Sequence, residues 1–275
     1  MNNGGIAIRL VNCARLISGR LPGSLAQTNI VANMLFGAIS GSGTAAAAAI
    51  GGTMAPIELE EGYDKDYVAA VNIASAPTGQ LIPPSNTLIV YATVAGSVSV
   101  AALFMAGYIP GIAWGISLMF IAGYMAKKRG YVSTFSVTPK EAIKVLWDAL
   151  PSLLLIIIVI GGILKGVFTA TEGSAIAVVY ALILSLCYRS LKIKDLPSII
   201  LSSCKTTCIV IFMIGVSSIM SWVMAYTMIP TAIANAMLSL SSNKYVILLL
   251  MNVILLVVGT FMDPTPAVLI FTPIF

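Results

Sequence analysis

Long apolar stretches, separated by short polar or charged segments, fill most of this 275-residue chain. Each is long enough for at least one membrane helix, which needs roughly 20 apolar residues, or for a pair of half-helices. Residues 1–28 and 138–150 instead mix apolar and charged positions, a pattern typical of helices that lie at a membrane interface. The apolar stretches run over about 29–57, 67–107, 110–126, 151–188, 207–239 and 245–275. The pattern predicts an all-α integral membrane protein.

Several of these stretches contain residues that do not suit a continuous membrane helix. The run SGSGT at Ser40–Thr44 predicts a re-entrant hairpin at 29–57, with two arms too short to cross and a polar tip. Pro83 and Pro84 lack backbone donors, so 67–107 is predicted to be a broken helix. The run GTFMDPTP at 259–266 predicts a second hairpin within 245–275, and Pro230 interrupts 207–239.

Basic clusters set the expected orientation. Lys127–Arg129 follows the span at 110–126, and a second cluster at 189–194 follows two further crossings, so both are expected on the cytoplasmic side. The two hairpins then enter the membrane from opposite sides. We therefore predict an inverted-repeat transporter, with a first repeat at 1–130 and a second repeat at 131–275. The acidic segment Glu58–Asp66 lies between the first hairpin and the apolar stretch that begins at 67. It is expected to be a solvated connection.

Composition strengthens the membrane assignment and excludes other classes. Hydrophobic residues make up 59% of the chain and charged residues only 9%, whereas a soluble protein carries about a quarter charged residues. The net charge of +5 comes from scattered clusters without a basic, aromatic-rich face, so we expect no nucleic-acid partner. The chain has no histidine and its four cysteines form no CxxC pair, which gives little support for an enzyme or a zinc site.

The candidate chemistry lies at the interrupted segments. Helix ends at a hairpin tip offer free N–H groups to anions and free carbonyls to cations, and hydroxyl and carbonyl oxygens suit Na⁺. Asp263 is an ionisable residue within a membrane element, where charge is costly. The alternatives are that SGSGT only allows close helix packing and that Asp263 caps the second arm. The predicted substrate- and ion-binding residues are Ser40, Gly41, Ser42, Gly43, Thr44, Pro83, Pro84, Ser85, Asn86, Gly259, Asp263 and Thr265, with Ser40, Ser42 and Gly79 as sodium ligands.

Six stretches together resemble a known family, in the same order and over nearly the whole chain. They are GGIAIRLVNCARLISGRLPGSLAQTNIVANMLFGAISGSG, the GYD at 62–64, LIPPSNTLIVYA, LFMAGYIPG, FTATEGSAIAVVYAL and GTFMDPTPAVLIFTPI. The chain resembles the large membrane subunit of the tripartite ATP-independent periplasmic (TRAP) transporters, the DctM-like family. This resemblance implies an elevator-type, sodium-driven secondary transporter with no cofactor beyond the coupling ion. The same resemblance implies that the second repeat is truncated at its C-terminal end. It also implies that the SGSGT tip and the IPPSNT loop form one half of the site, and that GTFMDPTP begins the other.

The resemblance further implies partners and a location. A small four-helix membrane subunit and a periplasmic substrate-binding protein are expected, with import of an organic acid, such as a C4-dicarboxylate or sialic acid, across a bacterial or archaeal cytoplasmic membrane. Family members usually carry further spans before the first interfacial helix and a second broken helix at the end, so we expect this chain to be incomplete and not to transport alone. The main alternative is a single-chain sodium-coupled divalent-anion symporter; a channel or purely structural membrane subunit is another.

Overall fold

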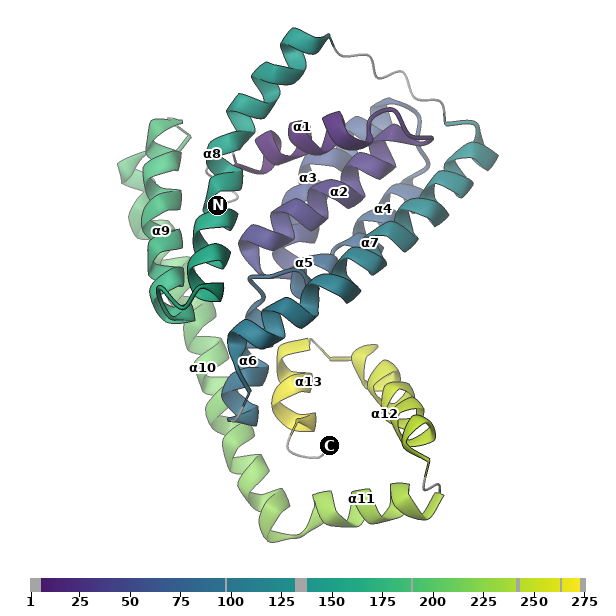
Figure 1. The fold of residues 1–275 in the computed structure, drawn as a ribbon, viewed down its shortest axis with the longest axis vertical. Coiled ribbons are helices and arrows are strands. Elements are labelled where there is room, and N and C mark those ends of the chain that lie inside the picture. Colours follow the sequence, from purple (N-terminus) through teal and green to yellow (C-terminus); the bar gives the residue numbers. More distant parts are fainter. Residues whose placement is uncertain are drawn as a thin grey trace. The chain divides into compact units, whose positions relative to one another are not determined.

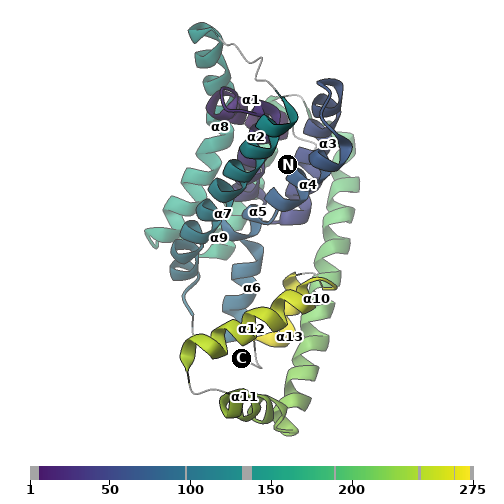
Figure 2. The same ribbon diagram turned by 90° about the vertical axis from the view of Figure 1, so that its right-hand side faces the viewer.

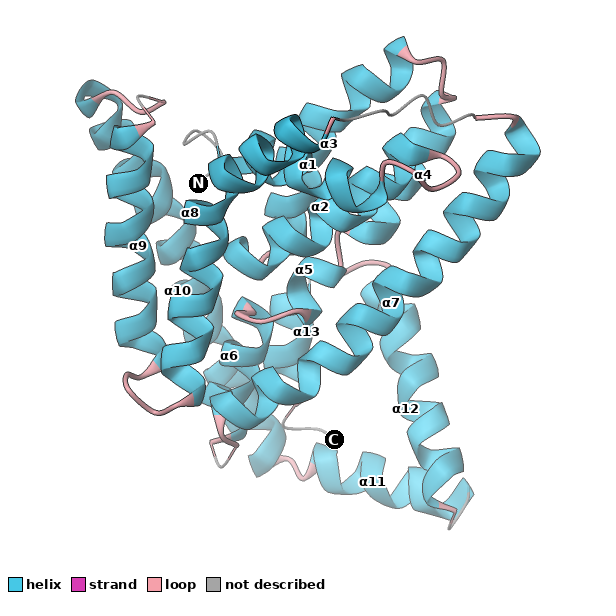
Figure 3. Ribbon diagram, turned by 45° about the horizontal axis from the view of Figure 1, so that its top comes forward, coloured by secondary structure: helices cyan, strands magenta, loops and turns pink. Residues whose placement is uncertain are grey.

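The computed structural model describes residues 6–96, 98–131, 138–188, 190–240, 243–262 and 264–272, and this part of the chain is helical without any strand (Figure 3). The chain divides into two compact units. One unit comprises Met1–Leu88 with Ser99–Ile193, and the other comprises Ile89–Val98 with Lys194–Phe275. The predicted division into inverted repeats at residue 130 follows different boundaries and stays a prediction.

The first unit is organised around one central helix, α2, which packs against α1, α3, α4, α5 and α7 (Figure 1). Nearly every side chain of α2 is buried, including its polar Gln27, Thr28, Asn29 and Asn33. The helices of this unit are α1 (Ile6–Ser18), α2 (Ser24–Ser40), α3 (Gly43–Glu60), α4 (Lys65–Ser75), α5 (Thr78–Leu81), α7 (Val100–Arg129), α8 (Pro139–Leu164) and α9 (Ala170–Cys187). Helix α6 (Asn86–Ala95) begins in this unit and continues into the other.

The second unit contains the last part of the chain. Its helices are α10 (Leu196–Tyr226), α11 (Ile229–Leu240), α12 (Lys244–Gly259) and α13 (Pro264–Phe271). Helix α13 packs against both α10 and α12 (Figure 2). The break between α10 and α11 falls at Thr227 and Met228 and not at Pro230 itself. Met228 has a left-handed φ of 57°. Pro230 lies in the first turn of α11, where a missing N–H leaves no helical bond unmade.

Both predicted hairpins have a counterpart in the structure. Helices α2 and α3 are joined by two residues and pack against each other, and α12 and α13 are separated by residues 260–263. The arms of the first contain 17 and 18 residues, or about 26 Å each at a rise of about 1.5 Å per residue. That is slightly less than the roughly 30 Å hydrocarbon core. Entry of the hairpins into a membrane stays a prediction.

Four helices of the described residues are long and apolar enough to cross a membrane. They are Val100–Arg129, Lys140–Leu164, Ala170–Cys187 and Ile193–Met224. Three of them clearly differ from the predicted boundaries. Helix α7 continues through Pro110, α8 joins the amphipathic 138–150 to the following span through Pro151, and the fourth span begins well before the predicted 207. A proline removes one hydrogen bond, which a long apolar helix tolerates when neighbouring groups compensate. A separate contact joins α8 to α9, because the Tyr180 hydroxyl on α9 donates to the Pro151 carbonyl at 2.8 Å.

In the described part of the amphipathic segment predicted at 1–28, α1 covers Ile6–Ser18 and α2 already begins at Ser24. Helix α1 buries Ile6, Leu10 and Ala14 and packs against α2 and α8. Its Arg9 guanidinium lies 3.5 Å from the centre of the Tyr188 ring, a favourable contact between a cation and an aromatic face.

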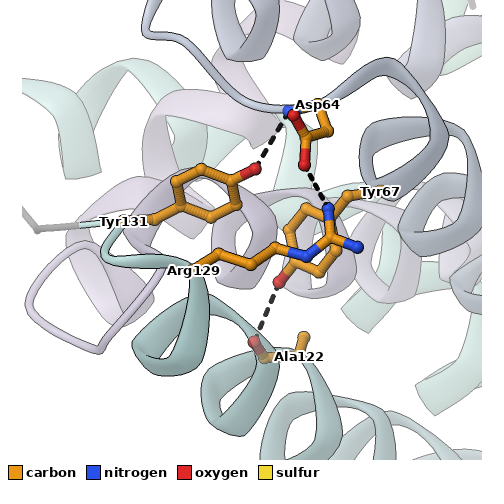
Figure 4. A network of polar contacts seen from close by, with 5 residues as sticks. All are labelled: Asp64, Tyr67, Ala122, Arg129 and Tyr131. Atoms are coloured by element: carbon orange, nitrogen blue, oxygen red, sulfur yellow. Dashed lines mark hydrogen bonds and ion pairs between the residues drawn. The ribbon is translucent and has the colours of Figure 1, made fainter.

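Tyr63, Tyr67 and Tyr131 form a cluster between the loop after α3, the start of α4 and the end of α7. Figure 4 shows the polar contacts of Tyr67 and Tyr131. The Tyr67 hydroxyl donates to the Ala122 carbonyl at 2.8 Å, the Asp64 N–H donates to the Tyr131 hydroxyl at 3.0 Å, and Arg129 forms an ion pair with Asp64. The ion pair is exposed, and such pairs contribute at most about 1 kcal/mol. The buried Tyr67 lies on α4, so its hydrogen bond joins α4 to α7.

Candidate functional site

The tip of the first hairpin reverses the chain within two residues. Gly41 closes α2 with a left-handed φ of 63°, and its N–H donates to the Gly37 carbonyl at 2.8 Å. This conformation suits glycine, which has no Cβ to clash. Ser42 then begins α3 as its N-cap, with its Oγ accepting from the Ala45 N–H at 3.3 Å. The sequence Gly-Ser thus supplies one residue to end a helix and one to begin the next.

The hydroxyl groups of the tip lie close to one another. Ser42 Oγ and Thr44 Oγ1 are 3.1 Å apart, and Ser40 Oγ donates to the Ser42 carbonyl at 3.3 Å. Ser40 and Ser42 are half-buried and Thr44 is exposed. Each hydroxyl oxygen has two lone pairs, so these contacts leave acceptor capacity at the tip.

The predicted break in the second apolar stretch is present and is formed by residues 76–85. Helix α4 ends at Ser75, the single turn α5 follows at Thr78–Leu81, and α6 begins at Asn86 after a cis Pro83–Pro84 bond. Ser85 is buried; its Oγ donates to the Gln80 carbonyl and accepts from the Leu88 N–H. This side chain therefore holds the loop 83–86 and begins α6 at the same time.

The hairpin tip and the broken helix are in direct contact. The Asn86 N–H donates to the Gly41 carbonyl at 3.1 Å. A Cβ placed on Gly41 would lie 2.6 Å from the Pro84 carbonyl oxygen, so no larger residue fits without displacing the loop. The structure thus brings together the predicted residues Ser40–Thr44 with Pro83–Asn86.

A second close approach lies one helical turn before the tip. A Cβ on Gly37 would lie 2.0 Å from the Gly79 Cα, so α2 and α5 meet backbone to backbone. Gly79, a predicted sodium ligand, is therefore packed against α2 beside the tip. Its role as a sodium ligand stays a prediction.

The second predicted half lies in the other unit and is described only in part. Gly259 ends α12, and Thr265 lies in the first turn of α13. Asp263 falls outside the described residues. The two predicted halves belong to different units.

Buried polar side chains between the arms of the first hairpin and α4 were not predicted. Asn33 Nδ2 lies 2.8 Å from Asn29 Oδ1, 2.9 Å from Ser75 Oγ and 3.2 Å from Asn72 Oδ1, which joins α2 to α4. The Asn72 amide in turn donates to the Ala47 carbonyl of α3 at 3.0 Å. Asn29 and Asn33 are four residues apart within an apolar stretch, and this spacing on one helix face was the available signal.

The position of Glu58 differs from the prediction. The segment 58–66 was predicted to be a solvated connection, but Glu58 lies in the last turn of α3 and is fully buried. The connection proper is the exposed part that follows, where Glu61 and Asp64 lie at the surface. The prediction was wrong for Glu58 because α3 extends two residues past it and packs against α2.

Three curated relatives align with essentially the whole chain. Uncharacterized protein YgiK of Salmonella typhimurium is 54% identical, over 100% of this chain and 63% of its own length. The isethionate TRAP transporter permease protein DctMQ of Oleidesulfovibrio alaskensis is 39% identical, over 100% and 43%. The sialic acid TRAP transporter large permease protein SiaM of Vibrio cholerae is 36% identical, over 99% and 64%. The chain thus spans less than two thirds of the length of these relatives.

The family comparison covers the entire sequence. Residues 1–275 match the family described as "Tripartite ATP-independent periplasmic transporter, DctM component". The four apolar helices agree with a multi-pass integral membrane protein, which is what a permease requires. The chain therefore belongs to the DctM component family of the tripartite ATP-independent periplasmic transporters.

Proposed function

We propose that this chain forms part of the large membrane subunit of a TRAP transporter that imports an organic acid, using a sodium gradient, across a bacterial cytoplasmic membrane. A small four-helix membrane subunit and a periplasmic binding protein that delivers the substrate complete the transporter. Membership of the DctM family supports the tripartite assembly. The observation that carries the site assignment is the contact between the hairpin tip and the loop 83–86.

The arrangement of helix ends supports a site for both an anion and a cation. Helices α3 and α6 begin at Gly43 and Asn86, and α2 and α5 end at Ser40 and Leu81. Helix N-termini carry partial positive charge and favour a carboxylate, whereas C-terminal carbonyls favour Na⁺. The contact between Gly41 and Asn86 brings one end of each kind together. Ser40, Ser42 and Gly79 would supply hydroxyl and carbonyl oxygens to sodium.

The second hairpin would supply the other half of the site. Gly259 ends α12 and Thr265 lies in the first turn of α13, and Asp263 lies between them in the sequence. A carboxylate at Asp263 would balance the charge of a bound sodium ion, which offsets the cost of an ionised group in the membrane. We propose that both hairpins and the broken helix enter the membrane and move together across it, as a rigid body, with substrate and sodium bound.

The names of two relatives indicate the general chemical class of the substrate. DctMQ is named for isethionate and SiaM for sialic acid, and both compounds are organic acids. We propose an organic acid of this kind, or a C4-dicarboxylate, for the present chain. The binding protein would select among them, because the tip presents backbone groups and hydroxyls that suit any carboxylate or sulfonate.

Dependence on the binding protein tests the proposal against a single-chain symporter. Proteoliposomes containing the intact protein and its small membrane partner should accumulate a radiolabelled organic acid only when the cognate binding protein is outside. Omission of the binding protein should reduce uptake to the level of empty liposomes. Full uptake without it would contradict the tripartite proposal and favour a single-chain sodium-coupled divalent-anion symporter.

A further inference from the structure

Glu58 is a carboxylate buried without a cationic partner. Its side chain is 0% exposed, whereas Glu60 and Glu61 at the same end of α3 are exposed. The two carboxyl oxygens lie 3.2 and 3.4 Å from a single donor, the Asn29 amide nitrogen. Within the described residues, the ion pair identified joins Arg129 to Asp64, and Glu58 takes part in none.

Burial of this kind favours the neutral acid. An ionised carboxylate held away from water costs several kcal/mol unless a counter-charge or several hydrogen bonds compensate it, and one amide donor offsets only part of that cost. Protonation removes the charge. Glu58 lies at the base of the hairpin, outside the four candidate spans. Burial raises the pKa of its carboxyl to about 7, and the hydrogen bond from Asn29 lowers it by a smaller amount.

The titratable groups nearest to Glu58 are tyrosines. Tyr63 follows α3 and donates its backbone N–H to the Glu58 carbonyl at 2.9 Å, and Tyr67 lies on α4. The hydroxyl groups of both tyrosines interact electrostatically with the Glu58 carboxylate. Neither carries a positive charge that could keep Glu58 ionised.

The remaining charged groups on the helices around α3 lie elsewhere. Helix α1 carries Arg9, which lies over Tyr188, and Arg15, which borders a cavity of about 100 Å³ shared with Glu61. Helix α4 carries Lys65 and Asp66 on its exposed face, and α2 and α5 contain no charged side chain. The polar surroundings of the Glu58 carboxyl are therefore uncharged amides and hydroxyls.

We propose that Glu58 is a proton-binding site that links protonation to the packing of the first hairpin. The carboxyl is protonated while α3 is packed on α2, and it releases the proton when the base of the hairpin opens and water reaches it. The Asn29 side chain contacts the carboxyl from α2, so any separation of the two arms breaks this contact. The inference concerns the hairpin alone and does not depend on sodium coupling.

The sign of the pH effect follows from linkage. The packed state binds the Glu58 proton up to about pH 7, whereas an exposed glutamate releases it near 4.5. Protonation therefore favours packing, and the stabilisation is lost as pH rises between these values. A difference of about 2.5 pKa units corresponds to a roughly 300-fold change in the unfolding equilibrium constant across this window. Glu58→Gln, which is neutral at every pH, should lack this contribution.

Two measurements on the intact protein in detergent test the inference. Infrared spectra at pH 6 should contain a protonated carboxylic-acid band that is absent in Glu58→Gln and retained in the exposed control Glu60→Gln. Denaturation between pH 4.5 and 7 should show a steeper loss of stability for the parent and Glu60→Gln than for Glu58→Gln. If Glu58→Gln does not accumulate, Glu58→Met provides an uncharged variant of similar length. An unchanged band, or an unchanged pH slope, in the Glu58 variant would overturn the inference.

Discussion

Replacing Gly37 by alanine is expected to reduce sodium-dependent uptake about tenfold or more. The added Cβ would lie 2.0 Å from the Gly79 Cα and 2.9 Å from its backbone nitrogen, so it meets backbone rather than a movable side chain. Overpacking of this kind typically costs about 1–3 kcal/mol, and about 1.4 kcal/mol corresponds to a factor of ten. We expect α2 to move away from α5, which separates the hairpin tip from the loop 83–86.

Gly52→Ala is the matched control for this substitution. Gly52 also lies inside an arm of the hairpin, but a Cβ there would meet nothing within 4 Å. Alanine favours a helix over glycine by about 1 kcal/mol, so Gly52→Ala should retain uptake and leave stability equal or higher. Initial uptake rates, normalised to the amount of protein in the membrane, compare the two. Equal rates for Gly37→Ala and Gly52→Ala would contradict the importance of the α2–α5 contact.

Asp263→Ala is expected to abolish sodium-coupled uptake. A charged residue within a membrane element costs at least about 2.5–3.5 kcal/mol at the centre of the bilayer, so its presence there needs a compensating role. Charge balance for bound sodium is the role we propose. Asp263 also precedes Pro264, the first residue of α13, where a carboxylate can cap the helix. Asp263→Asn keeps a capping side chain and removes the charge, so it separates these roles.

The two variants give different results under the two explanations. If Asp263 balances sodium, both Asp263→Ala and Asp263→Asn lose uptake; if it only caps α13, Asp263→Asn retains it. Asp148→Ala, which removes an exposed carboxylate from α8, serves as the control and should transport normally. Sodium-dependent uptake by Asp263→Asn at the parent rate would contradict its assignment to the ion site.

The breaks in the helices could be predicted from sequence because their signals are local. Gly41 and Ser42 end one helix and begin another through their own backbone and side-chain preferences, and Pro83–Pro84 cannot continue a helix. Helix boundaries elsewhere were less accurate. Pro110 and Pro151 carry the same local signal, yet α7 and α8 continue through them. Both helices pack along their length against other helices, α7 against α2, α4 and α5 and α8 against α1 and α9, and such contacts are invisible to a local pattern.

The interior of the candidate site was predictable only in part. The sequence pointed to the tip and the loop 83–86, and the structure places them in contact. The role of Gly37 and the burial of Glu58 depend on how α2 packs against α3 and α5, so no neighbouring residue in the sequence indicates them. Glu58 looked like one acidic residue among several in a polar segment. Only the register of α3 against Asn29 distinguishes it from Glu60 and Glu61.

Sodium binding at the tip of the first hairpin is the central element of the proposed function. The sodium concentration for half-maximal uptake should be measured for the parent, Ser40→Ala and Ser117→Ala. Ser40 is a proposed ligand, whereas Ser117 is an exposed serine on α7 whose hydroxyl bonds only within its own helix. We predict an increase of about tenfold for Ser40→Ala, equivalent to ~1.4 kcal/mol, and little change for Ser117→Ala. The same sodium concentration in all three proteins would contradict the assignment of the tip as a sodium site.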